Sequence, residues 1–273
     1  MSNVGAPKLI AQLLETPPRS GLLREARGFI ELPRLLFRIY TLARQPRGQG
    51  EPVLVLPGYG AGDVSTALLQ GYLRFLGYRV RGLGRRSSAD EVPQLLTRVL
   101  KRLISVNRRN RQKVHIIGWS LGGYLAREAA RERPDLVHQV ITLGTPVIGG
   151  PKYTVVAHVL RRRGIDLDAI EAAIESRNRI ALTTPITAIY SRVDAVVAWE
   201  ACIDHLTSHV EHIEVGATHL GLGFSPDVYE IIAQRLAEAA TQRSDEPSFE
   251  TVATTALTSA EVLKGTLTSK EPA

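Results

Sequence analysis

From residue 53 onward, short β-branched and aliphatic runs alternate with segments of helical periodicity, which predicts strands separated by helices. The predicted strands span residues 53–56, 78–81, 114–117, 139–143, 186–190 and 212–215. Several of these runs are apolar at every position, which favours strands buried on both faces of a parallel sheet. The prediction is an α/β fold with a mostly parallel sheet of about six strands flanked by helices.

Helices are expected between these strands. The first follows the capping candidates Asp63 and Ser65, the second spans residues 90–104, the third starts near Ser120, and the last follows Ser225. The connection between the strand at 139–143 and the strand at 186–190 is long for a simple loop.

This long connection contains two segments with helical patterns, residues 155–162 and 167–176. We expect residues 147–184 to form a small cap that excludes water from a site at the sheet edge. A surface insertion unrelated to any substrate is the alternative.

The two ends of the chain differ in composition from residues 51–240, which are expected to form one folded domain. Within residues 1–50, charged side chains recur at spacings of three and four, which predicts an amphipathic helix that Pro33 kinks or divides. The charged positions are Arg24, Arg27, Glu31, Arg34 and Arg38. Two interpretations stay open: a helix packed on its own domain, and a basic helix lying on a membrane surface. Residues 241–273 are rich in Thr, Ser, Glu and Ala and are expected to be disordered.

Composition narrows the function classes. The 273 residues are 44% hydrophobic, as in ordinary globular proteins, and the formal net charge is +7. Basic side chains are scattered and aromatic residues make up only 5% of the chain, so no stacking platform for nucleic acid is expected. The single Cys202 cannot form an intrachain disulfide, and no Cys/His cluster suggests a metal site. The absence of a leader pattern and of a long apolar run predicts a cytoplasmic protein.

The most informative segment is Gly118-Trp119-Ser120-Leu121-Gly122, a Gly-x-Ser-x-Gly pattern between a predicted strand and a predicted helix. This context is typical of a nucleophile elbow, a strained turn that exposes a serine at the carboxyl edge of a sheet. The glycines let neighbouring backbone segments approach without a Cβ clash. A plain glycine-rich turn between strand and helix is the alternative.

A serine hydroxyl needs a histidine to take its proton and a carboxylate to orient that histidine. Asp194 and His219 each follow a predicted strand, in the chain order Ser, acid, His. We therefore predict a Ser120, Asp194, His219 triad. Asp204 is a competing acid but falls in a predicted helix, and His209 and His212 are the reserve candidates for the base.

The loop after the first predicted strand is Pro57-Gly58-Tyr59-Gly60-Ala61-Gly62-Asp63. For an ester hydrolase we expect the backbone N–H groups of Tyr59 and Leu121 to bind the oxyanion of the tetrahedral intermediate. A dinucleotide site is the alternative for such a loop, but its third glycine position is occupied by Asp63, which disfavours pyrophosphate.

These motifs, together with Thr142-Leu143-Gly144-Thr145-Pro146 and Tyr190-Ser191-Arg192-Val193-Asp194, resemble bacterial α/β hydrolases of the lipase/esterase kind over about residues 50–240. The resemblance implies the α/β-hydrolase fold, the triad above, substrate contacts at Gly58, Trp119 and Val147, and no metal or organic cofactor.

The function expected from these features is hydrolysis of carboxylic esters through an acyl-enzyme on Ser120. The segment after Pro146 is apolar, which favours small or lipid esters with hydrophobic acyl groups. Two alternatives stay open: an acyltransferase that uses the same triad, and a binding protein that has the fold without catalysis.

Overall fold

The computed structural model describes residues 14–84 and 92–245. Its centre is a six-stranded sheet in the order β2-β1-β3-β4-β5-β6, in which all five neighbouring pairs are parallel. The strands are β1 Pro52–Leu56, β2 Arg79–Gly82, β3 Val114–Trp119, β4 Val137–Leu143, β5 Ile186–Tyr190 and β6 Val210–Glu214. The predicted fold class is therefore confirmed, and each strand lies within two residues of the range expected from its apolar run.

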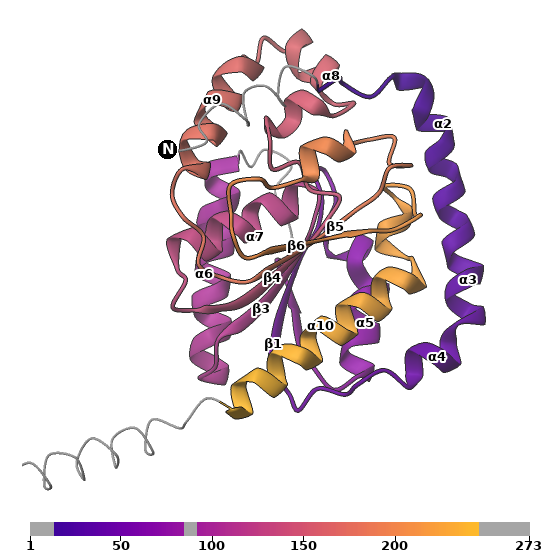
Figure 1. The fold of residues 1–273 in the computed structure, drawn as a ribbon, viewed down its shortest axis with the longest axis vertical. Helices are drawn as coiled ribbons and strands as arrows, with labels where there is room; N and C mark the ends of the chain where they lie inside the picture. The colour runs from indigo at the N-terminus through magenta and orange to yellow at the C-terminus, as the bar shows by residue number, and fades with distance from the viewer. Residues whose placement is uncertain (1–13, 85–91, 246–273) are drawn as a thin grey trace, which may run out of the picture.

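Two layers of helix cover the sheet (Figure 1). Helices α5 (Ala67–Phe75) and α10 (Pro226–Asp245) lie on one face, and α6 (Val92–Asn110) and α7 (Leu121–Glu132) lie on the other. Successive side chains of a strand point to opposite faces, so Val53 and Val55 pack with α5 and α10, while Leu54 and Leu56 pack with α6 and α7. This double burial is the reason that β1 and β3 contain no polar position on a solvent face.

Short helices fill the connections at the carboxyl edge of the sheet. They are η3 Asp63–Thr66, η4 Gly150–Tyr153, α8 Ala157–Arg162, α9 Leu167–Asn178, η5 Trp199–Cys202 and η6 Gly221–Gly223. The helices α8 and α9 lie together at one end of the molecule, where the long β4 to β5 connection was expected to form them (Figure 1). That α8 and α9 cover a bound substrate is a proposal.

The N-terminal segment is a broken helix that runs along the outside of the molecule (Figure 1). It consists of η1 Arg19–Gly21, α2 Leu22–Glu25, η2 Ala26–Ile30, α3 Glu31–Phe37 and α4 Ile39–Ala43. Pro33 is the third residue of α3 and lies within its first turn. The N–H groups of a first turn have no acceptor within their own helix, so α3 loses no hydrogen bond through the proline. The predicted division at Pro33 therefore occurs two residues earlier.

The C-terminal boundary differs from the prediction. The helix α10 continues to Asp245, so its last five residues, 241–245, lie within the predicted tail. The rest of the predicted disordered tail lies outside the described residues, as do positions 85–91, which include the predicted start of the helix at 90.

Candidate active site

Ser120 forms the turn between β3 and α7. Its backbone angles are φ 53° and ψ −120°, and Arg111 is the one other non-glycine residue with positive φ among the residues described. A non-glycine residue in this region costs about 1–3 kcal/mol and persists only where the surroundings impose it. The side chain of Ser120 is partly exposed. This is the local geometry that the Gly-x-Ser-x-Gly pattern predicted.

The glycines around Ser120 allow three backbone segments to meet. A Cβ built on Gly118 would lie 2.4 Å from the carbonyl of Gly122, and one built on Gly122 would lie 2.3 Å from the carbonyl oxygen of Leu56. Contacts this short do not occur for real Cβ atoms, so any side chain at either position would push the start of α7 away from β1 and β3. The predicted close approach is thus present.

His219 and Asp194 form a buried pair beyond the ends of β6 and β5. The Nδ1 atom of His219 lies 2.6 Å from Oδ2 of Asp194, and both side chains are almost fully buried. The other carboxylate oxygen of Asp194 accepts the backbone N–H groups of Val196 and Val197, each at 2.8 Å. These two bonds fix the orientation of the carboxylate. Because Nδ1 of His219 is bonded to Asp194, Nε2 is the ring nitrogen left for a proton transfer.

The end of β4 joins Ser120 to this pair. The carbonyl of Leu143 accepts the N–H of Ser120 at 2.8 Å, and the hydroxyl of Thr145 donates to the carbonyl of Ser120 at 3.0 Å. Between them, a Cβ built on Gly144 would lie 2.9 Å from Nδ1 of His219. The three predicted residues therefore stand on one edge of the sheet, around the Leu143–Thr145 turn.

The competing candidates for the acid and the base lie at the other edge of the sheet or bond to other groups. Asp204 is not in a helix, as the sequence had suggested, but in the loop after η5, where it pairs with buried Arg127. His209 is exposed and precedes β6, at the amino edge of the sheet. His212 lies within β6, and its Nε2 accepts the backbone N–H of Asp204 at 2.9 Å.

The pKa shifts of the residues outside the predicted triad agree with this assignment. Burial opposes ionisation of Asp204, but the charge and hydrogen bonds of Arg127 and the N–H groups of the loop outweigh it and lower the pKa of Asp204 to about 2. Burial lowers the pKa of His212. Burial also raises the pKa of the Cys202 thiol well above its usual range, which disfavours the thiolate and makes this residue a poor nucleophile.

The predicted oxyanion loop lies beside the elbow. A Cβ on Gly58 would lie 3.5 Å from Cβ of Ser120, so the loop passes directly over the serine. Tyr59 is exposed, and Leu121 supplies the first N–H of α7, a position that no carbonyl of the helix can satisfy. Asp63 accepts the N–H groups of Leu83 and Gly84 after β2, a structural role that accounts for an acid where a dinucleotide loop would need glycine.

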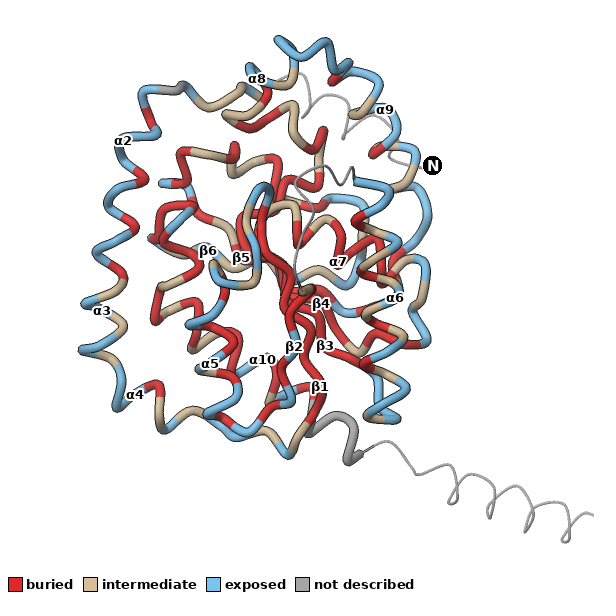
Figure 2. The backbone as a smooth tube through the Cα atoms, turned by 180° about the vertical axis from the view of Figure 1, so that it is seen from behind, coloured by how far each residue is buried: buried red, intermediate tan, exposed pale blue. Residues whose placement is uncertain are grey.

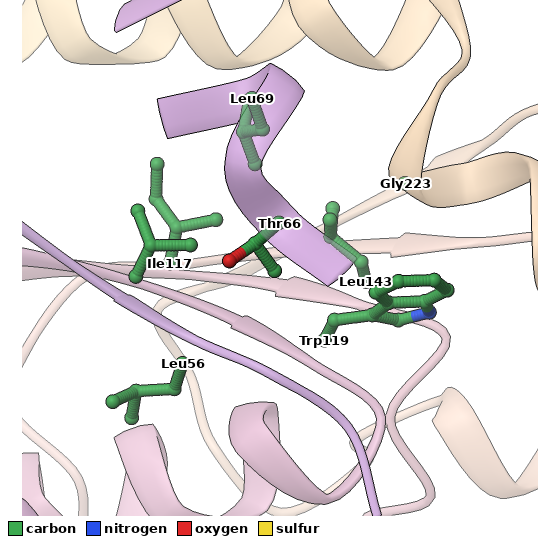
Figure 3. Close-up of a pocket in the computed structure, with 8 residues that line it drawn as sticks. Leu56, Thr66, Leu69, Ile117, Trp119, Leu143 and Gly223 are labelled. Carbon is green, nitrogen blue, oxygen red and sulfur yellow. The ribbon is translucent and has the colours of Figure 1, made fainter. Parts of the chain in front are cut away.

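Two predicted substrate contacts are buried. The indole of Trp119 packs on Gly223, with its ring centroid 6.1 Å from that of His219. Figure 3 shows it at the edge of a narrow space between β3 and α5 that has no room for a water molecule, so this space is core and not an acyl pocket. Val147 is 4% exposed, and its N–H donates to the carbonyl of Ala201. Substrate contact by Gly58, Trp119 and Val147 stays a prediction.

Sequence analysis did not single out Glu25. Its side chain is 3% exposed and reaches the backbone beside both Asp194 and His219. Glu25, Gly28 and Glu31 follow one another at a spacing of three and are all buried, so the signal in the sequence was a polar stripe with a glycine at its centre.

Comparisons with known proteins agree with this architecture. The chain is similar to a structure from work on LipS and LipT, two metagenome-derived lipolytic enzymes (17% identity, TM-score 0.58, covering 72% of this chain and 96% of that one). It is also similar to Est1E from Butyrivibrio proteoclasticus (14% identity, TM-score 0.54, 72% and 92% covered) and to the lipase BlEst2 from Bacillus licheniformis (14%, 0.55, 71% and 94%). At these identities the likeness concerns the fold.

In sequence, the chain is 29% identical over 105 residues to a pimeloyl-[acyl-carrier protein] methyl ester esterase from Aeromonas hydrophila. The match covers 36% of this chain and 39% of the length of that relative. A model of the alpha/beta hydrolase family matches residues 53–258, which is most of the chain. The chain therefore belongs to the α/β hydrolase family.

Proposed function

We propose that the protein is a serine carboxylic-ester hydrolase that works through an acyl-enzyme on Ser120. The observation that supports this most directly is the His219–Asp194 hydrogen bond of 2.6 Å on the same sheet edge as a strained, partly exposed serine. The esterases and lipases among its structural neighbours favour the same class of reaction.

The proposed reaction has two halves. Oγ of Ser120 attacks the ester carbonyl while Nε2 of His219 takes the hydroxyl proton, and Asp194 stabilises the resulting imidazolium through Nδ1–H. The N–H groups of Tyr59 and Leu121 stabilise the oxyanion. Collapse breaks the ester C–O bond, and His219 returns the proton to the leaving alcohol. Water then attacks the acyl-enzyme by the same route, which releases the acid and restores Ser120.

We also propose substrates with hydrophobic acyl groups, small or lipid in size. The segment after Pro146 begins with Val147 and Ile148 and continues into the predicted cap of α8 and α9. Contact of the N-terminal helices with a membrane surface would bring the enzyme to esters of this kind. A graded series of p-nitrophenyl esters measures the preferred chain length, and product analysis with added alcohols separates hydrolysis from acyl transfer.

A fluorophosphonate probe tests the nucleophile. Wild-type protein is expected to label with one probe per chain, and Ser120→Ala is expected to lose labelling and ester hydrolysis together, because the variant lacks the hydroxyl proposed to attack. Intact-protein mass spectrometry measures the adduct, and circular dichroism checks the fold. Equal labelling of the variant would exclude Ser120 as the nucleophile, and an unlabelled wild type would favour a non-catalytic binding protein.

A further inference from the structure

The N-terminal helices present their apolar side outward. Among residues 22–44, the buried side is formed by Glu25, Gly28, Glu31 and Leu42, of which two are acids. We call the opposite side the outer face; its large apolar side chains are exposed, and they are Leu22, Leu23, Phe29, Ile30, Leu36, Phe37, Ile39 and Tyr40. Figure 2 shows this segment at the rim of the molecule, exposed along most of its length. A soluble helix normally buries its apolar stripe, so this arrangement is inverted.

The exposure of the outer face is large. Leu23 is 86% exposed, Leu36 70%, Phe37 87% and Tyr40 79%. Three adjacent pairs of the outer face, 22–23, 29–30 and 36–37, recur at a spacing of seven, which is about two helical turns, so the apolar side chains follow one side of the segment and are not scattered single positions. Contiguous apolar surface of this kind marks a site of interaction with a protein or a membrane.

The charged side chains of residues 22–44 favour a membrane over a protein as the partner. Residues 22–44 contain only two acids, and both are turned inward: Glu25 bonds to the backbone of the body, and Glu31 binds Arg34. Arg34 and Arg38 are paired with Asp227 and Glu230 of α10. Arg24, Arg27 and Arg44 are exposed and make no ion pair with any residue that the structure describes. The outer face is thus apolar and cationic, with no carboxylate to repel an anionic surface.

We propose that the outer face docks on an anionic lipid surface, with the helices lying in the plane of the interface. Apolar side chains then enter the boundary between headgroups and acyl chains, and the three arginines meet lipid phosphates at its level. Phe29, Phe37 and Tyr40 suit this position, since aromatic rings are enriched there. A symmetric pairing of two copies would bring the same arginines together and is disfavoured. No helix in the described part of the chain is long and apolar enough to cross a bilayer, so the contact is peripheral.

Vesicle flotation of the full chain tests the proposal. Wild-type protein is expected to float with vesicles of phosphatidylglycerol and phosphatidylcholine, and at least about tenfold less with phosphatidylcholine alone. The variant Leu23→Ser/Phe37→Ser is expected to lose binding to both kinds of vesicle by about tenfold or more, because each substitution removes a largely exposed apolar side chain. Val159→Ser/Ile180→Ser, which changes exposed apolar residues outside the segment, is the matched control and is expected to float like wild type.

A second variant separates the charge from the apolar contribution. Arg24→Gln/Arg27→Gln/Arg44→Gln is expected to lower binding to anionic vesicles and to leave the weak binding to phosphatidylcholine unchanged, with added salt reproducing the effect. Wild type that does not float with anionic vesicles overturns the proposal, and so does a serine variant that floats equally well. A dimer in size-exclusion chromatography that becomes a monomer in the serine variant, without vesicle binding, would assign the face to a second copy of the chain.

The buried side of the same helices supports a second, independent inference. The Glu25 carboxylate accepts the N–H of Ala195 and of Leu220, both at 2.8 Å, and that of His219 at 3.3 Å. Ala195 follows Asp194, and Leu220 follows His219, so a single side chain ties together the loops of both proposed triad partners. Gly28 allows the approach, because a Cβ there would lie 2.7 Å from the backbone nitrogen of Gly221.

We infer that Glu25 is a positioning residue that sets the distance between the acid and the base; this inference rests on the proposed hydrolase function. Glu25→Gln replaces one accepting oxygen by an NH2 group that faces a backbone donor. The variant is expected to lower kcat by about 10- to 100-fold with little change in KM, since small displacements of aligned groups slow the chemical step. Glu31→Gln, a buried acid of the same helices, is the matched control and is expected to keep wild-type kcat.

The labelling rate with the fluorophosphonate probe supplies an independent readout. A merely structural role of Glu25 would lower the melting temperature and leave the kcat of the folded protein unchanged, which would overturn the inference. Wild-type kcat in Glu25→Gln would overturn it too. If wild-type protein itself is not labelled, the failure belongs to the proposed function and not to the role of Glu25.

Discussion

His219→Ala is expected to lower kcat for ester hydrolysis by about 10⁴-fold or more, because the members of a triad act as a unit and the serine loses its proton acceptor. The substitution removes a buried ring, so melting temperature must be measured with the kinetics. His209→Ala is the matched control: the residue is exposed at the opposite edge of the sheet, and this variant is expected to keep wild-type activity. A loss of less than about tenfold in His219→Ala would exclude it as the base.

Asp194→Asn extends the same experiment. The amide oxygen can still accept the N–H groups of Val196 and Val197, while its NH2 group would face Nδ1 of His219. An imidazole that accepts at Nδ1 bears its proton on Nε2, where it cannot take the proton of Ser120. Activity is therefore expected to fall by about 10⁴-fold with the loop intact, as in serine hydrolases held in the wrong tautomer. Activity near that of wild type would show that Asp194 does not orient the base.

The sequence predicted best what local patterns determine. The central strands β1, β3, β4 and β5 are mostly apolar, and the residues after the carboxyl ends of parallel strands necessarily share one edge, so Ser120, Asp194 and His219 could be placed together before any coordinates. The glycines beside Ser120 likewise predicted the close approach of β1, β3 and α7, since only a residue without Cβ fits where these segments meet.

The sequence predicted poorly what depends on distant partners. The segment before Asp204 has a helical pattern, but the chain forms only the short turn η5, and Asp204 instead pairs with Arg127, 77 positions earlier. The spacing of the N-terminal helices revealed an amphipathic pattern but not which side faces inward. The inward side contains Glu25, whose hydrogen-bond partners lie 170 to 195 positions away.

Arg127→Met is expected to destabilise the protein by about 3–5 kcal/mol at neutral pH, because it leaves the buried Asp204 carboxylate without its counter-charge. Arg127 is 3% exposed on α7, and Asp204 also accepts the N–H groups of Leu206 and Thr207. The pair ties the helix behind Ser120 to the loop between β5 and β6. Chemical denaturation of both proteins at matched pH measures the difference in the free energy of unfolding.

The pH dependence distinguishes this cause from lost packing. In wild type the folded-state pKa of Asp204 is about 2, below the ordinary value, so its contribution to stability is present above about pH 4 and is lost as pH falls toward 2. In Arg127→Met, burial without a partner raises that pKa, and acid then relieves the unpaired charge. The deficit of the variant is therefore expected to shrink as pH falls.

A paired substitution completes the test. Arg127→Met/Asp204→Leu removes both charges and is expected to recover most of the stability lost by Arg127→Met, since apolar side chains of similar volume replace buried ion pairs at little cost. The N–H groups of Leu206 and Thr207 lose their acceptor in the paired variant, so recovery is expected to be incomplete. A paired variant as unstable as Arg127→Met, with a deficit independent of pH, would show that Arg127 acts through packing of its side chain and not through its charge.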